Sequence, residues 1–134
     1  MTEPTLEQLH AIATTAAQHA YAPYSHFRVG AALLLTTGEI VTGTNVENGS
    51  YGLALCAEHS AVVRAVAEYG PQIRIAAVAI TNLNQAASPP CGACRQVLAE
   101  FTEPDAPIMF PMEGGQQTVP FREVFPFSFR LDRE

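Results

Sequence analysis

The apolar segment IRIAAVAIT, residues 73–81, constrains the fold more than any other part of this chain. Arg74 is its only charged residue, and every other side chain except that of Thr81 is apolar. A strand with apolar side chains pointing both ways suits a sheet that is covered on both faces. Because segments with helical spacing precede and follow this run, the sequence predicts a central strand packed between helices.

The remaining elements follow from spacing and from turn residues. Thr5 and Gln8 form a capping box, Gly38 marks a turn, and Gly70 with Pro71 ends a helix. The predicted elements are a helix at 5–20, a hairpin of strands at 28–37 and 40–46, helices at 56–69 and 91–101, and strands at 73–81, 106–112 and 117–121. Residues 122–134 receive no assignment. The order predicts an α/β fold, namely a three-layer α/β/α sandwich around a single mixed five-stranded sheet with right-handed crossovers.

Composition narrows the class of protein. The 134 residues suit one domain, predicted over residues 1–134, and 48% apolar with 15% charged residues is typical of a compact chain. The chain has no apolar run long enough to span a membrane and no signal-peptide pattern at its start, so we expect a cytoplasmic protein without a membrane partner. The net charge of −6, with scattered basic residues, argues against a nucleic-acid partner and favours a small substrate.

Three cysteines, Cys56, Cys91 and Cys94, are the candidate metal ligands. An odd number argues against a disulfide framework, and clustered cysteines in a reducing compartment are more often metal or redox groups. Cys91 and Cys94 would share one helix face, and a strand joining two helices on one side of a sheet can bring the start of the Cys56 helix beside them. Three thiolates suit one zinc ion whose fourth position stays open, which is typical of a catalytic site.

Glu58 lies two residues after Cys56 in a small, apolar run, where an unpaired buried carboxylate would be costly. Beside an open zinc position it can act as a general acid and base. A ligand-x-Glu followed by Pro-Cys-x-x-Cys is the signature of zinc deaminases that act on cytosine or adenine rings. Taken singly, the Cys-x-x-Cys pair fits a structural zinc or redox site about as well, and Cys-x-Glu indicates almost nothing. The combination favours catalysis.

Four segments, YAPYSHFRVGAALL, GTNVENGSYGL, CAE and PPCGACRQVL, resemble in order and spacing those of the short-chain, homotetrameric cytidine deaminases. The resemblance covers nearly the whole chain. It implies zinc-dependent hydrolysis of cytidine and 2′-deoxycytidine to uridine and 2′-deoxyuridine, with release of ammonia, in pyrimidine salvage. It also implies one zinc ion per chain, bound by the three cysteines, with Glu58 moving protons.

The same resemblance implies the substrate contacts. Asn45 and Glu47 would hydrogen-bond the ribose 3′-hydroxyl, which an amide and a carboxylate can recognise as donor and acceptor. Phe27 would pack against the pyrimidine ring, although the residues alone suggest a core position, and the Ala57 backbone amide would contact the base carbonyl. In a homotetramer with shared active sites, a neighbouring subunit's substrate would be reached by Gly49, Tyr51 and Phe129, with Phe127 as the alternative to Phe129.

His59 is the main departure from this family, which commonly has Arg there to donate hydrogen bonds to the zinc-bound thiolates. Taken alone, His59 is a surface or packed histidine more often than a ligand. Beside the zinc-bound thiolates it can donate a hydrogen bond but carries a full charge only when protonated, so we expect the zinc site to depend on pH more strongly than in an Arg-bearing relative. Pro89, where Ser or Thr is common, keeps the backbone carbonyl that would accept from the substrate amino group.

Two alternatives remain open. A deaminase of another aminated pyrimidine nucleoside, such as a blasticidin-like antibiotic, shares the chemistry, although the NVEN segment favours a plain ribose. A non-catalytic structural zinc or thiol-redox module belongs to a different class, and it predicts a closed site and a dispensable Glu58.

Overall fold

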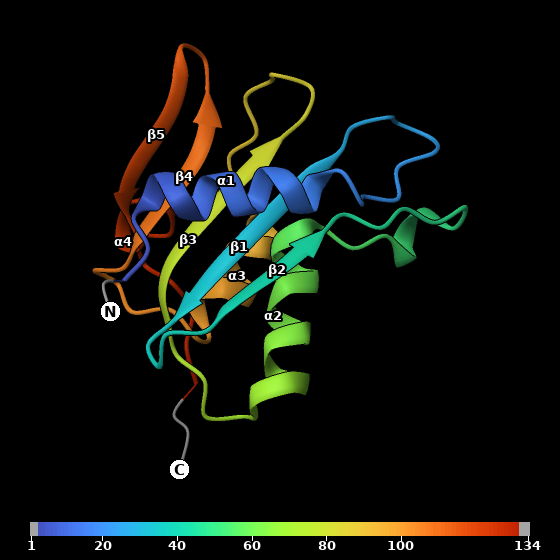
Figure 1. Ribbon diagram of the computed structural model, residues 1–134. Coiled ribbons are helices and arrows are strands. Elements are labelled where there is room, and N and C mark those ends of the chain that lie inside the picture. Colours follow the sequence, from blue (N-terminus) through green and yellow to red (C-terminus); the bar gives the residue numbers. More distant parts are fainter. Residues whose placement is uncertain (1–2, 132–134) are drawn as a thin grey trace.

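Strand β3 (Ile75–Asn82) is the central strand of a five-stranded sheet with the order β2-β1-β3-β4-β5 (Figure 1). The other strands are β1 (Val29–Leu35), β2 (Ile40–Thr44), β4 (Pro107–Met112) and β5 (Gly115–Pro120). β3 and β4 are parallel, whereas the other neighbouring pairs are antiparallel. The sheet in this computed structural model, which describes residues 3–131, is therefore mixed, as the sequence predicts.

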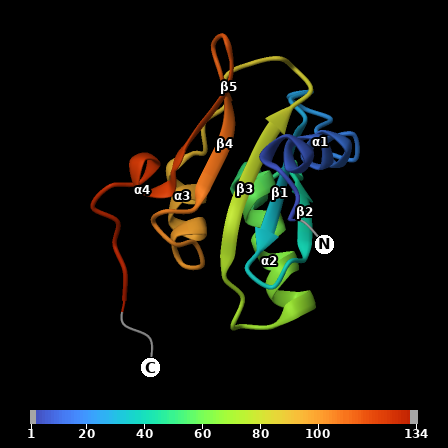
Figure 2. The ribbon, with the colours of Figure 1, turned by 60° about the vertical axis from the view of Figure 1, so that its left-hand side comes forward.

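Helices cover both faces of this sheet. Helix α1 (Leu6–Ala17) lies over β1 and β3 on one face, and α2 (Ala57–Tyr69) and α3 (Gly92–Ala99) lie side by side on the other (Figure 2). A 3₁₀ helix, η1 (Tyr51–Leu53), precedes α2, and a one-turn helix, α4 (Phe121–Val124), follows β5. The predicted α/β/α sandwich is thus confirmed. Within residues 3–131, no helix combines the length and the apolar character that a membrane span requires.

The two faces of the sheet carry cores of different texture. Large side chains fill the core on the α2 and α3 side, among them Leu33, Leu35, Val78 and Ile80. The core under α1 is built mainly on small side chains of the same two strands, Ala32, Ala77 and Ala79. Because side chains alternate along a strand, one apolar run supplies both cores. This is why residues 73–81 show no polar alternation.

Observed boundaries differ from the predicted ones by a few residues. The first helix ends at Ala17 rather than at residue 20, because the chain must turn for the Tyr21 N–H to donate to the Asn45 carbonyl. The fifth strand begins at Gly115, since Gly114 and Gly115 both adopt positive φ in a tight turn. Residues 121–124 form α4, and residues 132–134 of the unassigned tail lie outside the described part of the chain.

Candidate active site

The starts of α2 and α3 converge on the three cysteines. Cys56 and Cys91 each occupy the residue before the first helical one, and their Sγ atoms are 3.9 Å apart. All three Sγ atoms, including that of the buried Cys94, lie within 4.8 Å of one another. The Cys94 backbone N–H donates to Cys91 Sγ at 3.4 Å. Helix N-termini stabilise thiolates, so the fold prepares these sulfurs for a cation.

The donor set fits zinc. Zinc–sulfur bonds of about 2.3 Å in a tetrahedron place the sulfurs about 3.8 Å apart, close to the observed Cys56–Cys91 separation. Among residues 3–131, no fourth His, Cys, Asp or Glu belongs to this group. A hydrogen bond with Cys94 lowers the pKa of Cys56 to about 6, while the same interaction raises the pKa of Cys94. Cys56 therefore ionises before Cys94, and the three residues can hold one metal ion with one coordination position left open.

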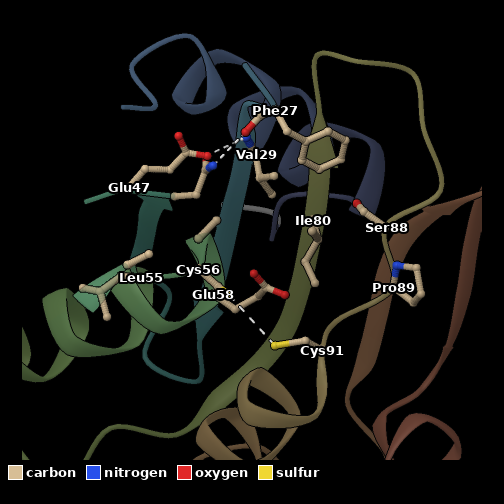
Figure 3. Close-up of a pocket in the computed structure, with 13 residues that line it drawn as sticks. Phe27, Val29, Glu47, Leu55, Cys56, Glu58, Ile80, Ser88, Pro89 and Cys91 are labelled. Carbon is tan, nitrogen blue, oxygen red and sulfur yellow. Dashed lines mark hydrogen bonds between the residues drawn. The ribbon is translucent and has the colours of Figure 1, made fainter. Parts of the chain in front are cut away.

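Glu58 is the buried acidic group of this site. The residue is 5% exposed, and its side chain points into a pocket of about 300 Å³ that Cys56 and Cys91 also line (Figure 3). Burial raises the pKa of Glu58 to about 7, because desolvation penalises the carboxylate. Glu58 is thus not an exposed helix residue, and a cation held by the thiols would lie beside it, since Cys56 and Cys94 both act on its pKa.

The pocket brings together most of the predicted site residues. Its lining contains Phe27, Asn45, Glu47, Cys56, Ala57, Glu58 and Cys91. Ser88 and Pro89, from the loop before α3, and Ile80 of β3 complete the wall that the close-up shows (Figure 3). Ala57 is the first residue of α2, so its N–H has no acceptor within the helix and is available to a ligand.

Glu47 is held as a carboxylate at the rim of this pocket. Its Oε1 accepts from the backbone N–H groups of Tyr24 at 3.0 Å and Ser25 at 3.2 Å, and its Oε2 accepts from Ser25 Oγ. The Ser25 hydroxyl is the largest cause that lowers the pKa of Glu47. Ser25 is not among the residues predicted from the sequence, where its only signal is its place in the YAPYSHF segment.

Asn45 has a structural task that the sequence does not reveal. Its Nδ2 donates to the Phe27 carbonyl at 2.7 Å, and its Oδ1 accepts from the Val29 N–H at 2.9 Å. One Nδ2–H and one Oδ1 lone pair remain for a ligand.

Besides the buried Cys94, four predicted site residues do not line this pocket, and neither does Phe127, the alternative to Phe129. Gly49 and Tyr51 are exposed, and Tyr51 borders an adjoining pocket beyond Glu47. Phe129 lies in the tail, where its carbonyl accepts from Gln96 Nε2 at 3.3 Å, and Phe127 is fully exposed. His59 lies in a groove between α2 and α3, close enough for its charge to lower the pKa of Cys56 to a lesser extent than the thiol hydrogen bonds do. Within the described chain its imidazole donates no hydrogen bond to the thiols.

A pocket that joins a three-thiol metal site to a buried carboxylate is the arrangement of the zinc deaminases. Comparison with known proteins places the chain more closely. The family model for the cytidine and deoxycytidylate deaminase zinc-binding region matches residues 3–109. The chain belongs to this cytidine deaminase family.

Individual relatives agree with that placement. A cytidine deaminase of Halalkalibacterium halodurans is 41% identical over 121 residues, which cover 90% of each chain. One of Mycobacterium tuberculosis is 45% identical over 120 residues, covering 90% of this chain and 86% of its own. The crystal structure of cytidine deaminase from Burkholderia pseudomallei superposes with a TM-score of 0.84 at 40% identity, covering 94% of this chain and 100% of the other.

Proposed function

We propose that this chain catalyses the zinc-dependent hydrolytic deamination of cytidine and 2′-deoxycytidine to uridine and 2′-deoxyuridine, with release of ammonia. The proposal rests on family membership, on relatives described as cytidine deaminases, and above all on one observation in the site. That observation is the buried Glu58 carboxyl, which lines the same pocket as Cys56 and Cys91.

Glu58 is the proposed proton carrier. Zinc, when bound by the three cysteines, supplies a Lewis acid that lowers the pKa of a water molecule toward neutrality. Glu58 accepts one proton from the attacking water and delivers it to ring N3. It then moves the second proton of that water, now on the C4 hydroxyl, to the amino group, so that the C4–N bond breaks, ammonia leaves and C4 becomes a carbonyl. Its burial keeps bulk water from competing for these protons, and the rigid first turn of α2 holds it beside the thiols.

The other lining residues are proposed to orient the nucleoside. The free Ala57 N–H donates to the base carbonyl, the Pro89 carbonyl accepts from the amino group, and the Phe27 ring packs against the pyrimidine. Glu47 accepts from the ribose 3′-hydroxyl, and the remaining Nδ2–H of Asn45 donates to it. The lowered pKa of Glu47 supports this role, because an ionised carboxylate is an acceptor only.

We also propose a homotetramer in which Gly49, Tyr51 and Phe129 reach a neighbouring subunit's site. Tyr51 is 82% exposed and Phe129 is 64% exposed, and the apolar residues Leu53, Phe127 and Leu131, close to them in sequence, are exposed too. Such exposure on a single chain supports an interface. Light scattering should give a mass of four chains; a fully active monomer would contradict the proposal.

Three free thiols kept for a metal support a cytoplasmic location, and the uridine product supports a place in pyrimidine salvage.

The decisive experiment measures zinc and turnover together. The purified protein should hold one zinc per chain and show the ultraviolet change of deamination with cytidine and deoxycytidine, but not with cytosine or adenosine. Glu58→Gln should keep its zinc and lose activity by at least about 100-fold. Unchanged activity in that variant would refute the proton-carrier role. A preference for a blasticidin-like nucleoside would favour a deaminase of another aminated pyrimidine nucleoside. Bound zinc without any turnover would favour a structural zinc module.

A further inference from the structure

The turn that carries Phe27 needs support from outside itself. Residues 26–28 lie just before the first residue of β1, and His26 adopts a φ of 59°. A non-glycine residue in this left-handed region is strained and persists only where surrounding contacts hold it. The Phe27 ring lines the active-site pocket, so whatever holds this turn also places the ring.

Two asparagine side chains hold the turn, one from each side of β1. Asn45, directly after β2, bonds the Phe27 carbonyl and the Val29 N–H, as described above. Asn84, two residues beyond β3, makes the same pair of bonds one residue earlier: its Nδ2 donates to the His26 carbonyl at 3.0 Å, and its Oδ1 accepts from the Arg28 N–H at 3.1 Å.

This alternation follows from sheet geometry. Backbone groups of residues i and i+2 point to one side of a strand, and those of the residues between point to the other. β2 and β3 flank β1 on opposite sides. Just before β1, the backbone groups of residues 26–29 lack some of the hydrogen bonds that β2 and β3 would give them in a continuous sheet. Each asparagine side-chain amide takes the place of the neighbouring strand's backbone there.

Asn84 is itself placed by Asn82, the last residue of β3. The buried Asn82 Oδ1 accepts from the backbone N–H groups of Asn84 at 3.0 Å and Ala86 at 3.2 Å. Its Nδ2 donates to the Ala86 carbonyl at 2.8 Å and to Ser88 Oγ at 3.0 Å. All four hydrogen-bonding positions of this amide are used, which makes the loop a rigid mount for Asn84. The same loop continues into Ser88 and Pro89 of the pocket wall (Figure 3).

We propose that Asn84 is a positioning residue of this active site, which holds residues 26–28 so that the Phe27 ring stays against the bound base. The proposal rests on the proposed function, since it needs a pyrimidine in the pocket. Asn84 is exposed and does not line the pocket, so it acts through Phe27 and not by touching the substrate.

A double-mutant cycle tests this coupling. Asn84→Ala should raise KM for cytidine about tenfold while kcat changes less than about threefold. Phe27→Ala should raise KM at least as much, and adding Asn84→Ala to it should change KM little further. Gln85→Asn is the matched control, because Gln85 is the next residue, is exposed and also has a positive φ, and its variant should behave like the parent. Increases in KM that multiply in the double variant, or a loss confined to kcat, would overturn the proposal.

Amide hydrogen exchange separates failure of this proposal from failure of the proposed function. In Asn84→Ala the Arg28 N–H loses its acceptor and should exchange about tenfold faster, whereas the Val29 N–H, bonded to Asn45, should change less. An unchanged exchange rate of the Arg28 N–H would refute the proposal that Asn84 holds residues 26–28, even if the parent does not deaminate cytidine. Should Asn84→Ala fold poorly, Asn84→Asp keeps the acceptor for Arg28 and loses only the donor, so its KM should fall between those of the parent and Phe27→Ala.

Discussion

Cys56 and Cys91 stand 35 positions apart in the chain, yet their sulfur atoms lie 3.9 Å from each other. Each immediately precedes a helix, and β3 lies between those two helices in the sequence. α2 runs away from Cys56, and β3 then returns the chain to the end of the sheet at which α2 began. α3 can therefore start beside α2 on the same face. One crossover thus places two thiols and two helix N-termini around one point, where the dipoles favour negative sulfur.

Removing the metal should expose the cysteines to alkylation in a definite order. In chelator-treated protein, Cys56 should react first, because it is exposed and its pKa is lowered to about 6. Cys94 should react last, since it is 2% exposed and its pKa is raised. Peptide mass spectrometry over a time course with iodoacetamide measures this order, and added zinc should protect all three. Equal rates at Cys56 and Cys94 would contradict the arrangement.

Two glycine variants should separate fold stability from metal binding. A Cβ at Gly43 would lie 2.4 Å from the Ala61 nitrogen and 2.5 Å from the Ala57 carbonyl oxygen, so Gly43→Ala must push the start of α2 off the sheet. A Cβ at Gly30 would instead meet the Ala13 carbonyl of α1 at 2.1 Å, on the opposite face.

Both variants should lose about 3 kcal/mol of unfolding free energy, measured with urea. Only Gly43→Ala should also weaken zinc binding, by about tenfold, because it moves Cys56. Zinc competition with a chromogenic chelator gives the second quantity, and equal zinc affinity in both variants would show that α2 absorbs the added methyl elsewhere.

Glu58 should make the metal-free protein less stable as pH rises. Its pKa is 4.5 when unperturbed and about 7 in the fold, so between these values the unfolded chain releases a proton that the folded chain retains. The loss of unfolding free energy caused by ionising Glu58 is absent below pH 4.5, grows between the two pKa values, and reaches its full size above about pH 7. Glu58→Gln, which cannot ionise, should therefore gain about 2 kcal/mol relative to the parent between pH 5 and pH 8. Urea unfolding of both proteins in chelator measures it; a difference that does not vary with pH would be inconsistent with a buried, ionising carboxyl.

Ser25 should control the ionisation of Glu47. Because the Ser25 hydroxyl is the main group lowering the pKa of Glu47, Ser25→Ala should raise that pKa toward 4.5. Carboxyl-carbon NMR titration reads the pKa directly. Ser50→Ala is the control, since Ser50 lies in the same region and is exposed. The acidic limb of the substrate-binding profile should move to higher pH in Ser25→Ala alone, and an unmoved titration would assign the shift to the two backbone N–H groups.

His59→Arg should widen the pH range of zinc binding. An imidazole beside the thiols is charged only when protonated, whereas a guanidinium is charged throughout. Zinc affinity of the parent should therefore fall relative to the variant as pH rises from 5 to 9, and activity should follow. Superimposable normalised profiles of the two proteins would show that His59 does not act on the thiolates.

Several site residues could be placed from sequence because their spacing was local. Cys91 and Cys94 share a helix turn, and Glu58 follows Cys56 by two residues, so pattern alone grouped them. Asn84 could not be found this way, because its partners lie 56 and 58 positions away and nothing in the NLNQAASPP segment points to them. The double use of Asn45 was hidden for the same reason.

The amino-acid sequence by itself determined the central apolar strand, the order of helices and strands, and the set of thiols and carboxyl that carry the chemistry, because each depends on side-chain type at short spacing. Only the tertiary structure decided that Glu58 is buried, that the sulfur atoms of Cys56 and Cys91 lie close together, and that two asparagine side chains hydrogen-bond the turn that carries Phe27. The first two facts depend on how the chain between Cys56 and Cys91 brings the starts of α2 and α3 together. The third depends on which backbone groups β2 and β3 leave unpaired just before β1, and strand lengths and register across the whole fold set both.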